Sequence, residues 1–227
     1  PVRTVAKAVA GRAHKLSDDV VDPLTEFRAV NCDATLQLAR LAIKAGVRRF
    51  IFISSIGVNG SSNNKPFTSE CTPKPTEPYA QSKWEAEMGL WDIFRGSDAQ
   101  LVIIRPPLVY GPNAPGNFAR LIKTANKAIP LPLGAIHNRR SLVALDNLVD
   151  LIVTCIDHPA AANQTFLVSD GEDLSTTELL RRMGVALGKP ARLLPVPSRL
   201  LEVGATMLGK QALAQRLCGS LQVDISK

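Results

Sequence analysis

The 227-residue sequence lacks several features that would assign it to a class at once. No apolar run approaches the roughly 20 residues that span a bilayer, and the opening stretch "PVRTVAKAVAGRAHK" has no apolar core of a signal peptide. The four cysteines contain no Cys-x-x-Cys spacing and predict no disulfide framework; they are Cys32, Cys71, Cys155 and Cys218. We therefore expect a cytoplasmic protein in a reducing compartment, with no membrane partner.

Signatures of metal binding and of nucleic-acid binding are missing as well. His14, His137 and His158 are scattered, and none pairs with a cysteine or a carboxylate at metal-ligand spacing. The net charge is +7, yet the basic residues occur as isolated pairs such as Arg139-Arg140, without a run or a basic helix face. We predict no metal and no nucleic-acid partner, although one or two arginines would suffice to bind a small anion.

The sequence does contain a globular composition, with 45% hydrophobic residues, and alternating signals for helices and strands. Asp22, Pro23 and Gly46 predict the N-cap, first turn and end of a long helix. Its expected apolar stripe comprises Leu24, Phe27, Ala34, Leu38, Leu41 and Ala45. The runs "RFIFISS" and "LVIIRPP" predict strands buried on both faces, separated by a loop from Gly57 to Pro78 and a helix beginning near Tyr79. This order predicts a parallel α/β sheet.

Signals in the second half of the chain are weaker. We expect helices near 117–127, 146–157, 175–187 and 198–208, and short strands near 141–144 and 165–168. Asp146 is a plausible N-cap, and Ser175 with Glu178 forms a plausible capping box.

The stretch "YAQSK" holds Tyr79 and Lys83 four residues apart. On a helix these side chains share one face, and a nearby ammonium favours the phenolate over the phenol. The pair therefore suits acid/base chemistry. Because three positions of the pattern are free, it is weakly specific when taken alone.

Five motifs follow one another in the chain: "AGRAH", a helix with Asn31, the strand end Ser54-Ser55, "YAQSK" and "RPPLVYGP". This succession resembles the extended short-chain dehydrogenase/reductase family, in its NAD-dependent epimerase/dehydratase branch that acts on nucleotide sugars. The resemblance implies an α/β fold with a Rossmann-like doubly wound parallel sheet and a smaller α/β substrate-binding lobe. It also implies a dinucleotide-binding domain over 1–110, to which 141–168 returns, and a substrate-binding lobe over 111–140 and 169–227.

The resemblance implies roles for individual residues. Tyr79 would exchange a proton with the sugar's C4 oxygen, Ser55 would hydrogen-bond that oxygen, and Lys83 would lower the pKa of Tyr79 and hold the nicotinamide ribose. Asn117 and Arg139 would contact the nucleotide diphosphate. The positions implied for the cofactor are Ala10, Gly11, Arg12, Asn31, Ser54, Tyr79, Lys83, Pro106 and Val109. For Asn31 a structural role is equally open, and Ser54 should point away from Ser55.

Departures from the family pattern narrow the chemistry. Ile56 and Gly57 stand where dehydratases carry an acid and a base, and Gly57 does not supply the cysteine of 3,5-epimerising reductases. The chemistry that remains within the family is hydride transfer at C4 of a UDP-hexose. The enzyme would be either a C4 epimerase or a 4-keto-sugar reductase of polysaccharide biosynthesis. A hydroxysteroid or flavonoid reductase and a non-catalytic NAD(P)-binding regulator are the alternatives.

No Gly-x-x-Gly-x-x-Gly turn for the dinucleotide pyrophosphate occurs in the sequence. We therefore expect that the chain is a fragment or omits a segment, that alone it binds the cofactor weakly, and that NAD and NADP cannot be told apart. Trp84, Met88 and Trp91 form a helical stripe that could pack against its copy in a homodimer.

Overall fold

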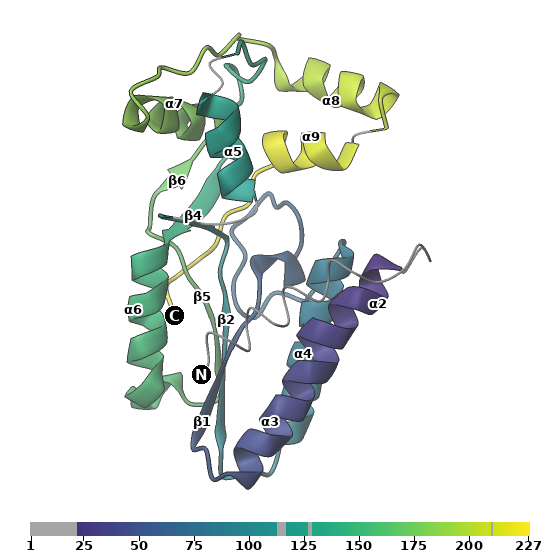
Figure 1. Cartoon of the computed structure of the whole chain (residues 1–227), viewed down its shortest axis with the longest axis vertical. Helices are drawn as coiled ribbons and strands as arrows, with labels where there is room; N and C mark the ends of the chain where they lie inside the picture. Colours follow the sequence, from purple (N-terminus) through teal and green to yellow (C-terminus); the bar gives the residue numbers. More distant parts are fainter. Residues whose placement is uncertain (1–21, 113–116, 127–128, 210) are drawn as a thin grey trace.

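The computed structural model describes residues 22–112, 117–126, 129–209 and 211–227 (Figure 1). The predicted cofactor positions Ala10, Gly11 and Arg12 lie outside these ranges. Within the described ranges, no helix combines the length and the apolar character needed to cross a membrane.

Three strands form the first sheet: β1 (Arg49–Ile53), β2 (Gln100–Arg105) and β5 (Gln164–Leu167). They are parallel, in the order β1-β2-β5, with Phe50 opposite Leu101 and Ile103 opposite Thr165. The apolar runs read from the sequence thus form parallel strands, and the predicted α/β class is confirmed. Strand β2 is buried as expected, whereas in β1 only Phe52 is buried and its neighbours are partly exposed.

Helices cover both faces of this sheet (Figure 1). One layer comprises α2 (Pro23–Phe27), the π-helical turn η1 (Arg28–Asp33), α3 (Ala34–Lys44) and α4 (Pro78–Phe94), and α6 (Leu145–Asp157) lies on the other face. Successive side chains of a strand point to opposite faces. Accordingly Leu101 and Ile103 pack with the α3–α4 layer, whereas Val102 and Ile104 pack with α6.

The first helical segment begins at the predicted residue, but a different face of it is buried. Asp22 caps it, Pro23 opens it, and Gly46 follows its end with φ +73°. The expected apolar stripe is wrong, since Leu38 is 58% and Leu41 is 55% exposed. The buried face instead carries Cys32, Leu36, Ala39 and Ile43. A π-helical turn adds a residue to the helical repeat, which turns the predicted stripe of α3 toward the surface.

A second, smaller sheet comprises β3 (Leu108–Tyr110), β4 (Arg140–Ala144) and β6 (Asp173–Leu174). Strand β4 pairs parallel with β3 and antiparallel with β6. Since β4 belongs to this sheet while β5 belongs to the first, residues 141–168 contribute to both. The predicted domain boundaries remain a prediction.

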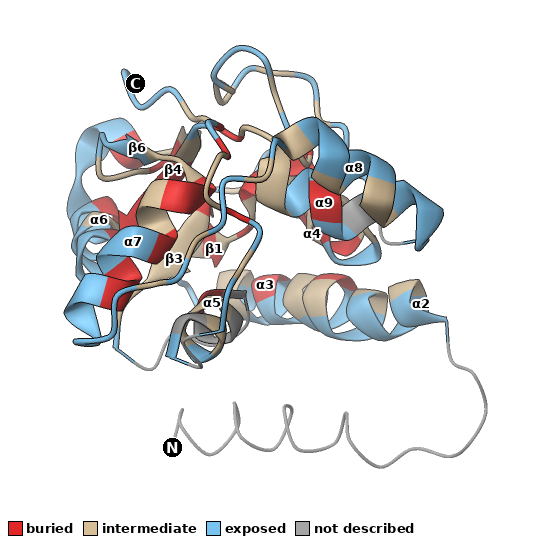
Figure 2. Ribbon diagram, turned by 90° about the horizontal axis from the view of Figure 1, so that it is seen from above, coloured by how far each residue is buried: buried red, intermediate tan, exposed pale blue. Residues whose placement is uncertain are grey.

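The helices around the second sheet are α5 (Asn117–Asn126), α7 (Thr176–Ala186), α8 (Ser198–Met207) and α9 (Gln211–Cys218). Two short 3-10 turns adjoin strands of the first sheet: η2 (Ile56–Val58) follows β1, and η3 (Pro159–Ala161) precedes β5. The predictions near 117–127, 146–157, 175–187 and 198–208 are confirmed within a few residues, whereas α9, β3 and β6 were not predicted. Ser175 caps α7 by accepting a hydrogen bond from the Glu178 amide. Asp146 lies in the first turn of α6, and Ala144 is the N-cap. In Figure 2 the surface of α8 is largely exposed, and α8 contains no buried residue.

The C-terminal residues tie the long loop after β1 to the second sheet. Val223 forms a parallel bridge with Phe67, and Leu221 forms one with Arg140. Asn63 and Gln222 exchange two hydrogen bonds, of 2.7 and 3.0 Å. The loop is therefore held to the C-terminal residues at Asn63 and Phe67.

Candidate active site

Tyr79 lies in the first turn of α4. Glu77 is the N-cap and Pro78 is the first helical residue, a position where the missing N–H of proline costs nothing. The side chain of Tyr79 is 39% exposed, and its ring packs edge-on against Phe27 with the centroids 5.5 Å apart. Partial burial raises the pKa of the Tyr79 phenol.

Lys83 follows one turn later on the same face of α4. Its Nζ donates a hydrogen bond of 3.0 Å to the carbonyl of Ile53, at the end of β1. The Nζ lies 4.6 Å from the centroid of the Phe52 ring and 6.0 Å from that of the Tyr79 ring. Burial lowers the pKa of Lys83, and the negative charge of Glu87 partly opposes this.

The expectation that Lys83 lowers the pKa of Tyr79 remains a prediction. The pKa of Tyr79 is raised, and burial is the cause. In this structure the ammonium donates to a strand carbonyl and lies nearer to the ring of Phe52 than to that of Tyr79.

Ser55 and Ser54 follow β1 and point in opposite directions, as strand alternation predicts. Ser55 has extended backbone angles, and its hydroxyl accepts a hydrogen bond of 3.1 Å from the amide of Gly57. Ser54 is 3% exposed, and its hydroxyl donates to the carboxylate of Glu87. The hydroxyl proton of Ser54 is thus engaged within the core, and the predicted contact of Ser54 with a cofactor remains a prediction.

Gly57 lies close to both Ser55 and helix α4. A Cβ added to Gly57 would lie 3.1 Å from the Cβ of Ala80 and 3.3 Å from the Oγ of Ser55. Ala80, which follows Tyr79, and the hydroxyl of Ser55 therefore both lie next to Gly57. The structure thus gathers Ser55, Tyr79 and Lys83 at the carboxyl end of β1, the edge at which parallel α/β sheets bind ligands.

Asn31 lies in the π-helical turn η1, a kind of distortion that is frequent at functional sites. Its Nδ2 donates a hydrogen bond of 3.0 Å to the hydroxyl of Ser82. Ser82 in turn donates one of 2.8 Å to the carbonyl of Tyr79. Asn31 therefore braces the first turn of α4, and its role toward a cofactor remains a prediction.

Pro106 and Val109 follow β2. The carbonyl of Pro106 accepts a hydrogen bond of 3.0 Å from the amide of Ile56. Val109 pairs with Val143 across β3 and β4, and its side chain packs against the core beneath α6. Their predicted backbone contacts with the nicotinamide remain predictions.

The two residues predicted for the diphosphate come from separate elements. Asn117 is the first residue of α5. Arg139 is exposed, and no carboxylate of the described residues forms an ion pair with it. By contrast, the guanidinium of Arg140 donates to the carbonyls of Arg216 and Gly219, and burial lowers its pKa. Arg139 is therefore the member of the pair whose charge is available at the surface.

A group that the sequence reading missed lies beneath these residues. Glu87, one turn beyond Lys83, is fully buried and bonds to Ser54 and to Arg105. The i+4 spacing from Lys83 was a usable signal for its face of the helix. Nothing in the sequence showed that a carboxylate there would be buried.

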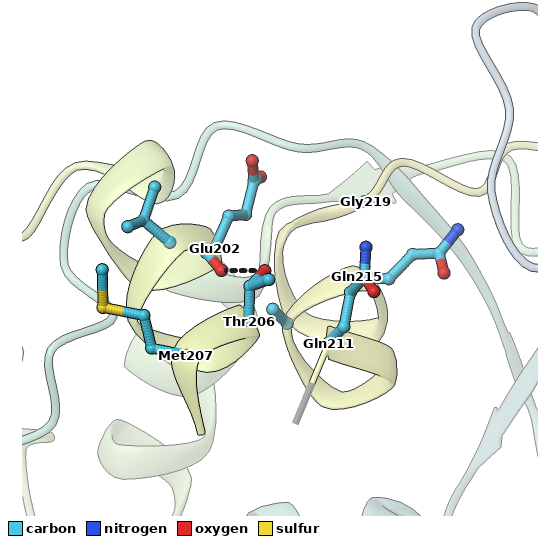
Figure 3. Close-up of a pocket in the computed structure, with 8 residues that line it drawn as sticks. Glu202, Thr206, Met207, Gln211, Gln215 and Gly219 are labelled. Atoms are coloured by element: carbon cyan, nitrogen blue, oxygen red, sulfur yellow. Dashed lines mark hydrogen bonds between the residues drawn. The ribbon is translucent and has the colours of Figure 1, made fainter. Parts of the chain in front are cut away.

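An open cavity of about 560 Å³ lies between α8 and α9 (Figure 3). Its lining includes Glu202, Thr206 and Gln215 but none of the predicted site residues, and the hydroxyl of Thr206 donates to the carbonyl of Glu202. Among the described residues, no three His, Cys, Asp or Glu side chains gather as a metal site would require. The absence of a metal stays a prediction.

Comparison with curated proteins finds two informative relatives. The chain is 51% identical over 226 residues to UDP-glucose 4-epimerase of Vibrio cholerae, covering 98% of this chain and 69% of the relative. It is 28% identical to N-acetyl-alpha-D-glucosaminyl-diphospho-ditrans,octacis-undecaprenol 4-epimerase of Escherichia coli O157:H7, covering 92% of this chain and 67% of that protein. These relatives support the C4 epimerase alternative over the reductase.

Among solved structures, UDP-glucose 4-epimerase of Thermotoga maritima with UDP-glucose superposes with a TM-score of 0.69 at 21% identity. The match covers 90% of this chain and 63% of that one, so the chain spans less than two thirds of the solved protein. The superposition confirms the predicted Rossmann-like fold. The model of the NAD dependent epimerase/dehydratase family matches residues 2–169. The chain therefore belongs to the NAD-dependent epimerase/dehydratase family.

Proposed function

We propose that the full-length gene product is a nucleotide-sugar C4 epimerase and that this chain supplies its acid/base residues. One observation carries the proposal: Tyr79 and Lys83 share a face of α4 at the carboxyl end of β1, beside Ser55. The identity of 51% to a UDP-glucose 4-epimerase supports a UDP-hexose as the substrate.

NAD is the cofactor of the family, and the described residues fit the nicotinamide end of such a molecule. Lys83 uses one N–H donor on Ile53 within the described residues, which leaves donors for the hydroxyls of a ribose. Asn31, Pro106 and Val109 are proposed to line the same end of the site. When bound, NAD supplies a reversible acceptor for the hydride of a sugar carbon.

Tyr79 would hold or accept the proton of the C4 oxygen, with Ser55 donating a hydrogen bond to the same oxygen. Burial raises the pKa of the Tyr79 phenol above its ordinary value and so favours the protonated form. The resting side chain is therefore set to donate a proton. Acting as a base requires a positive charge near the phenol, which Lys83 would supply by turning from the Ile53 carbonyl.

Arg139 and Asn117 are proposed to bind the diphosphate. A guanidinium donates in a fixed fork that matches phosphate oxygens, and that of Arg139 is exposed without an ion-pair partner among the described residues. A hydroxysteroid or flavonoid substrate carries no diphosphate. Loss of both side chains should therefore raise the KM for a UDP-sugar sharply, and an unchanged KM would favour that alternative.

The decisive experiment incubates the full-length protein with UDP-glucose, or with UDP-N-acetylglucosamine, and analyses the products. An epimerase interconverts each sugar with its galacto form and shows no net consumption of NADH. Stoichiometric loss of NADH or NADPH with UDP-4-keto-6-deoxy-N-acetylglucosamine would instead identify a 4-keto-reductase. No turnover of any UDP-sugar would favour a regulator.

A homodimer is proposed on the outer face of the α3–α4 layer. Leu38 and Leu41 on α3 and Met88 on α4 are 58%, 55% and 41% exposed. Trp84 and Trp91 are only partly buried, and Trp91 packs against the core beside them. Light scattering of the full-length protein tests the proposal, and a monomer would reject it.

A second candidate substrate is a sugar carried on a lipid diphosphate, as in the name of the E. coli relative. The helices α8 and α9 favour it, with exposed apolar side chains at Leu200, Val203, Met207, Leu208 and Leu213. Residues 189–218 contain five basic residues and one acidic residue, Glu202. Apolar side chains beside basic ones suit an anionic membrane surface, contrary to the expectation of no membrane partner.

Vesicle flotation separates the two candidates. A protein that acts on a lipid-linked sugar should float with phosphatidylglycerol vesicles and not with phosphatidylcholine vesicles, and Met207→Asp should abolish the binding. Absence of flotation with either vesicle, together with turnover of UDP-sugars, would leave the soluble nucleotide sugar as the substrate.

A further inference from the structure

Four polar side chains form a continuous buried network beneath the candidate site. Ser54, Asn59, Glu87 and Arg105 are 3%, 2%, 0% and 4% exposed. Arg105 donates through Nη2 to Glu87 at 2.6 Å and through Nη1 to Asn59 at 3.1 Å, while Ser54 donates to the other carboxylate oxygen of Glu87. Every buried polar side-chain atom of the described residues has a partner.

Stability alone does not explain such a pair. Desolvating two charges costs about as much as their attraction returns, and replacing a buried ion pair by apolar residues of similar size is often neutral or stabilising. A fully bonded network does, however, fix the relative positions of the elements that carry its members. Here Ser54 follows the end of β1, Asn59 lies in the loop after β1, Arg105 ends β2, and Glu87 belongs to α4.

The network meets the catalytic face of α4 directly. Tyr79, Lys83 and Glu87 occur at intervals of four residues, so they lie along one face of the helix. Lys83 binds the carbonyl of Ile53, and Glu87 accepts from the hydroxyl of Ser54. Ile53 and Ser54, at the end of β1, are thus bound by Lys83 and Glu87 from two consecutive turns of α4. Ser55 is the next residue of the chain.

We infer that Glu87, held by Arg105, is a positioning residue that binds Ser54 and so sets the place of Ser55 relative to Tyr79 and Lys83. The inference rests on the proposed function. Neither Glu87 nor Arg105 can touch a substrate, since both are buried. Their effect reaches the reaction through the geometry of Ser55, and displacement of a reacting group by about 1 Å can cost roughly 100-fold in rate.

Ser54→Ala removes one link and leaves the ion pair intact. We expect kcat to fall by about tenfold with KM nearly unchanged, since a misplaced Ser55 weakens the transition state more than binding. The matched control is Ser141→Ala, because Ser141 is also buried, at 2%, and its hydroxyl donates to the carboxylate of Asp173 in the other sheet. Its kcat should stay at the wild-type value.

A readout independent of turnover is hydrogen exchange at the amides of Ser54 and Ile56, which bond to the carbonyls of Ile104 and Pro106. In Ser54→Ala both amides should exchange at least about tenfold faster, because local opening becomes easier. The amides of Leu101 and Ile103 should be unchanged. If wild type shows no turnover, the proposed function fails, and exchange alone decides whether the network fixes the end of β1.

The double variant Glu87→Met/Arg105→Met separates positioning from stability. It should keep or raise the unfolding midpoint while kcat falls by roughly 100-fold. A folded double variant with wild-type kcat would overturn the inference. If the double variant does not fold, Ser54→Ala decides, and for it a kcat within twofold of wild type overturns the inference whatever the exchange shows.

Discussion

The side-chain amide of Asn31 donates a hydrogen bond of 3.0 Å to the hydroxyl of Ser82, and Ser82 passes one of 2.8 Å to the carbonyl of Tyr79. The π-helical turn therefore holds the first turn of α4, where the helix has no side-chain cap. The position of the Tyr79 phenol therefore depends on this relay of two hydrogen bonds through Ser82.

Ser82→Ala removes both hydrogen bonds of the relay at once. We expect kcat to fall by about tenfold, because a looser first turn spends less time in the reactive geometry. The control is Gln81→Ala, since the side chain of Gln81 bonds only to Glu85 among the described residues. Steady-state kinetics on both variants checks the prediction, and equal kcat values for the two would contradict it.

Gly57→Ala should destabilise the fold. The added Cβ would meet the Cβ of Ala80 at 3.1 Å and the Oγ of Ser55 at 3.3 Å. Overpacking of this kind costs about 1 to 3 kcal/mol of unfolding free energy. Gly204→Ala is the contrasting control, because a Cβ there meets nothing within 4 Å inside α8. That change should stabilise by about 0.5 to 1 kcal/mol, and urea denaturation measures both; equal effects would refute the packing argument.

The ion pair between Arg28 and Glu85 predicts a dependence of stability on pH. Its hydrogen bonds, of 2.6 and 2.7 Å, lower the pKa of Glu85 in the folded state. The contribution to stability is therefore present above the unfolded pKa of about 4.3 and is lost as the pH falls through the folded value. Both residues are partly exposed, so the effect is small. The urea midpoints of wild type and Glu85→Gln should differ at pH 7 and coincide near pH 2; a constant difference would contradict this.

Cys71 should be the first of the four cysteines to react with iodoacetamide. Hydrogen bonds from Thr68 lower its pKa, whereas burial raises the pKa of Cys32, Cys155 and Cys218. Because the thiolate is the reactive form, peptide mapping after brief alkylation at pH 8 should find Cys71 modified first. Thr68→Ala should slow the reaction, and preferential modification of Cys218 would show that exposure outweighs the hydrogen bonds.

Much of the fold was predictable because short apolar runs indicate strands. "RFIFISS" and "LVIIRPP" became β1 and β2, and the spacing of Tyr79 and Lys83 placed both on one helix face. The π-helical turn was not readable, since a single added residue leaves no compositional mark, yet it exposed Leu38 and Leu41.

The buried pair of Glu87 and Arg105 was equally hidden. The two residues are 18 positions apart and belong to different elements, and only the folded chain brings them within 2.6 Å. The direction of the Lys83 ammonium likewise depends on the Ile53 carbonyl, which belongs to a neighbouring strand. Contacts of this kind arise from tertiary packing, which local patterns do not specify.

The central claim is that Tyr79 moves the proton of the C4 oxygen, and the most direct test is the kcat of Tyr79→Phe in the full-length protein with UDP-glucose. The variant keeps the ring that packs against Phe27, so it should fold with an unchanged melting temperature. We predict a loss of at least about 100-fold in kcat, the usual contribution of a positioned acid/base group. Interconversion of UDP-glucose and UDP-galactose at the wild-type rate would contradict the assignment.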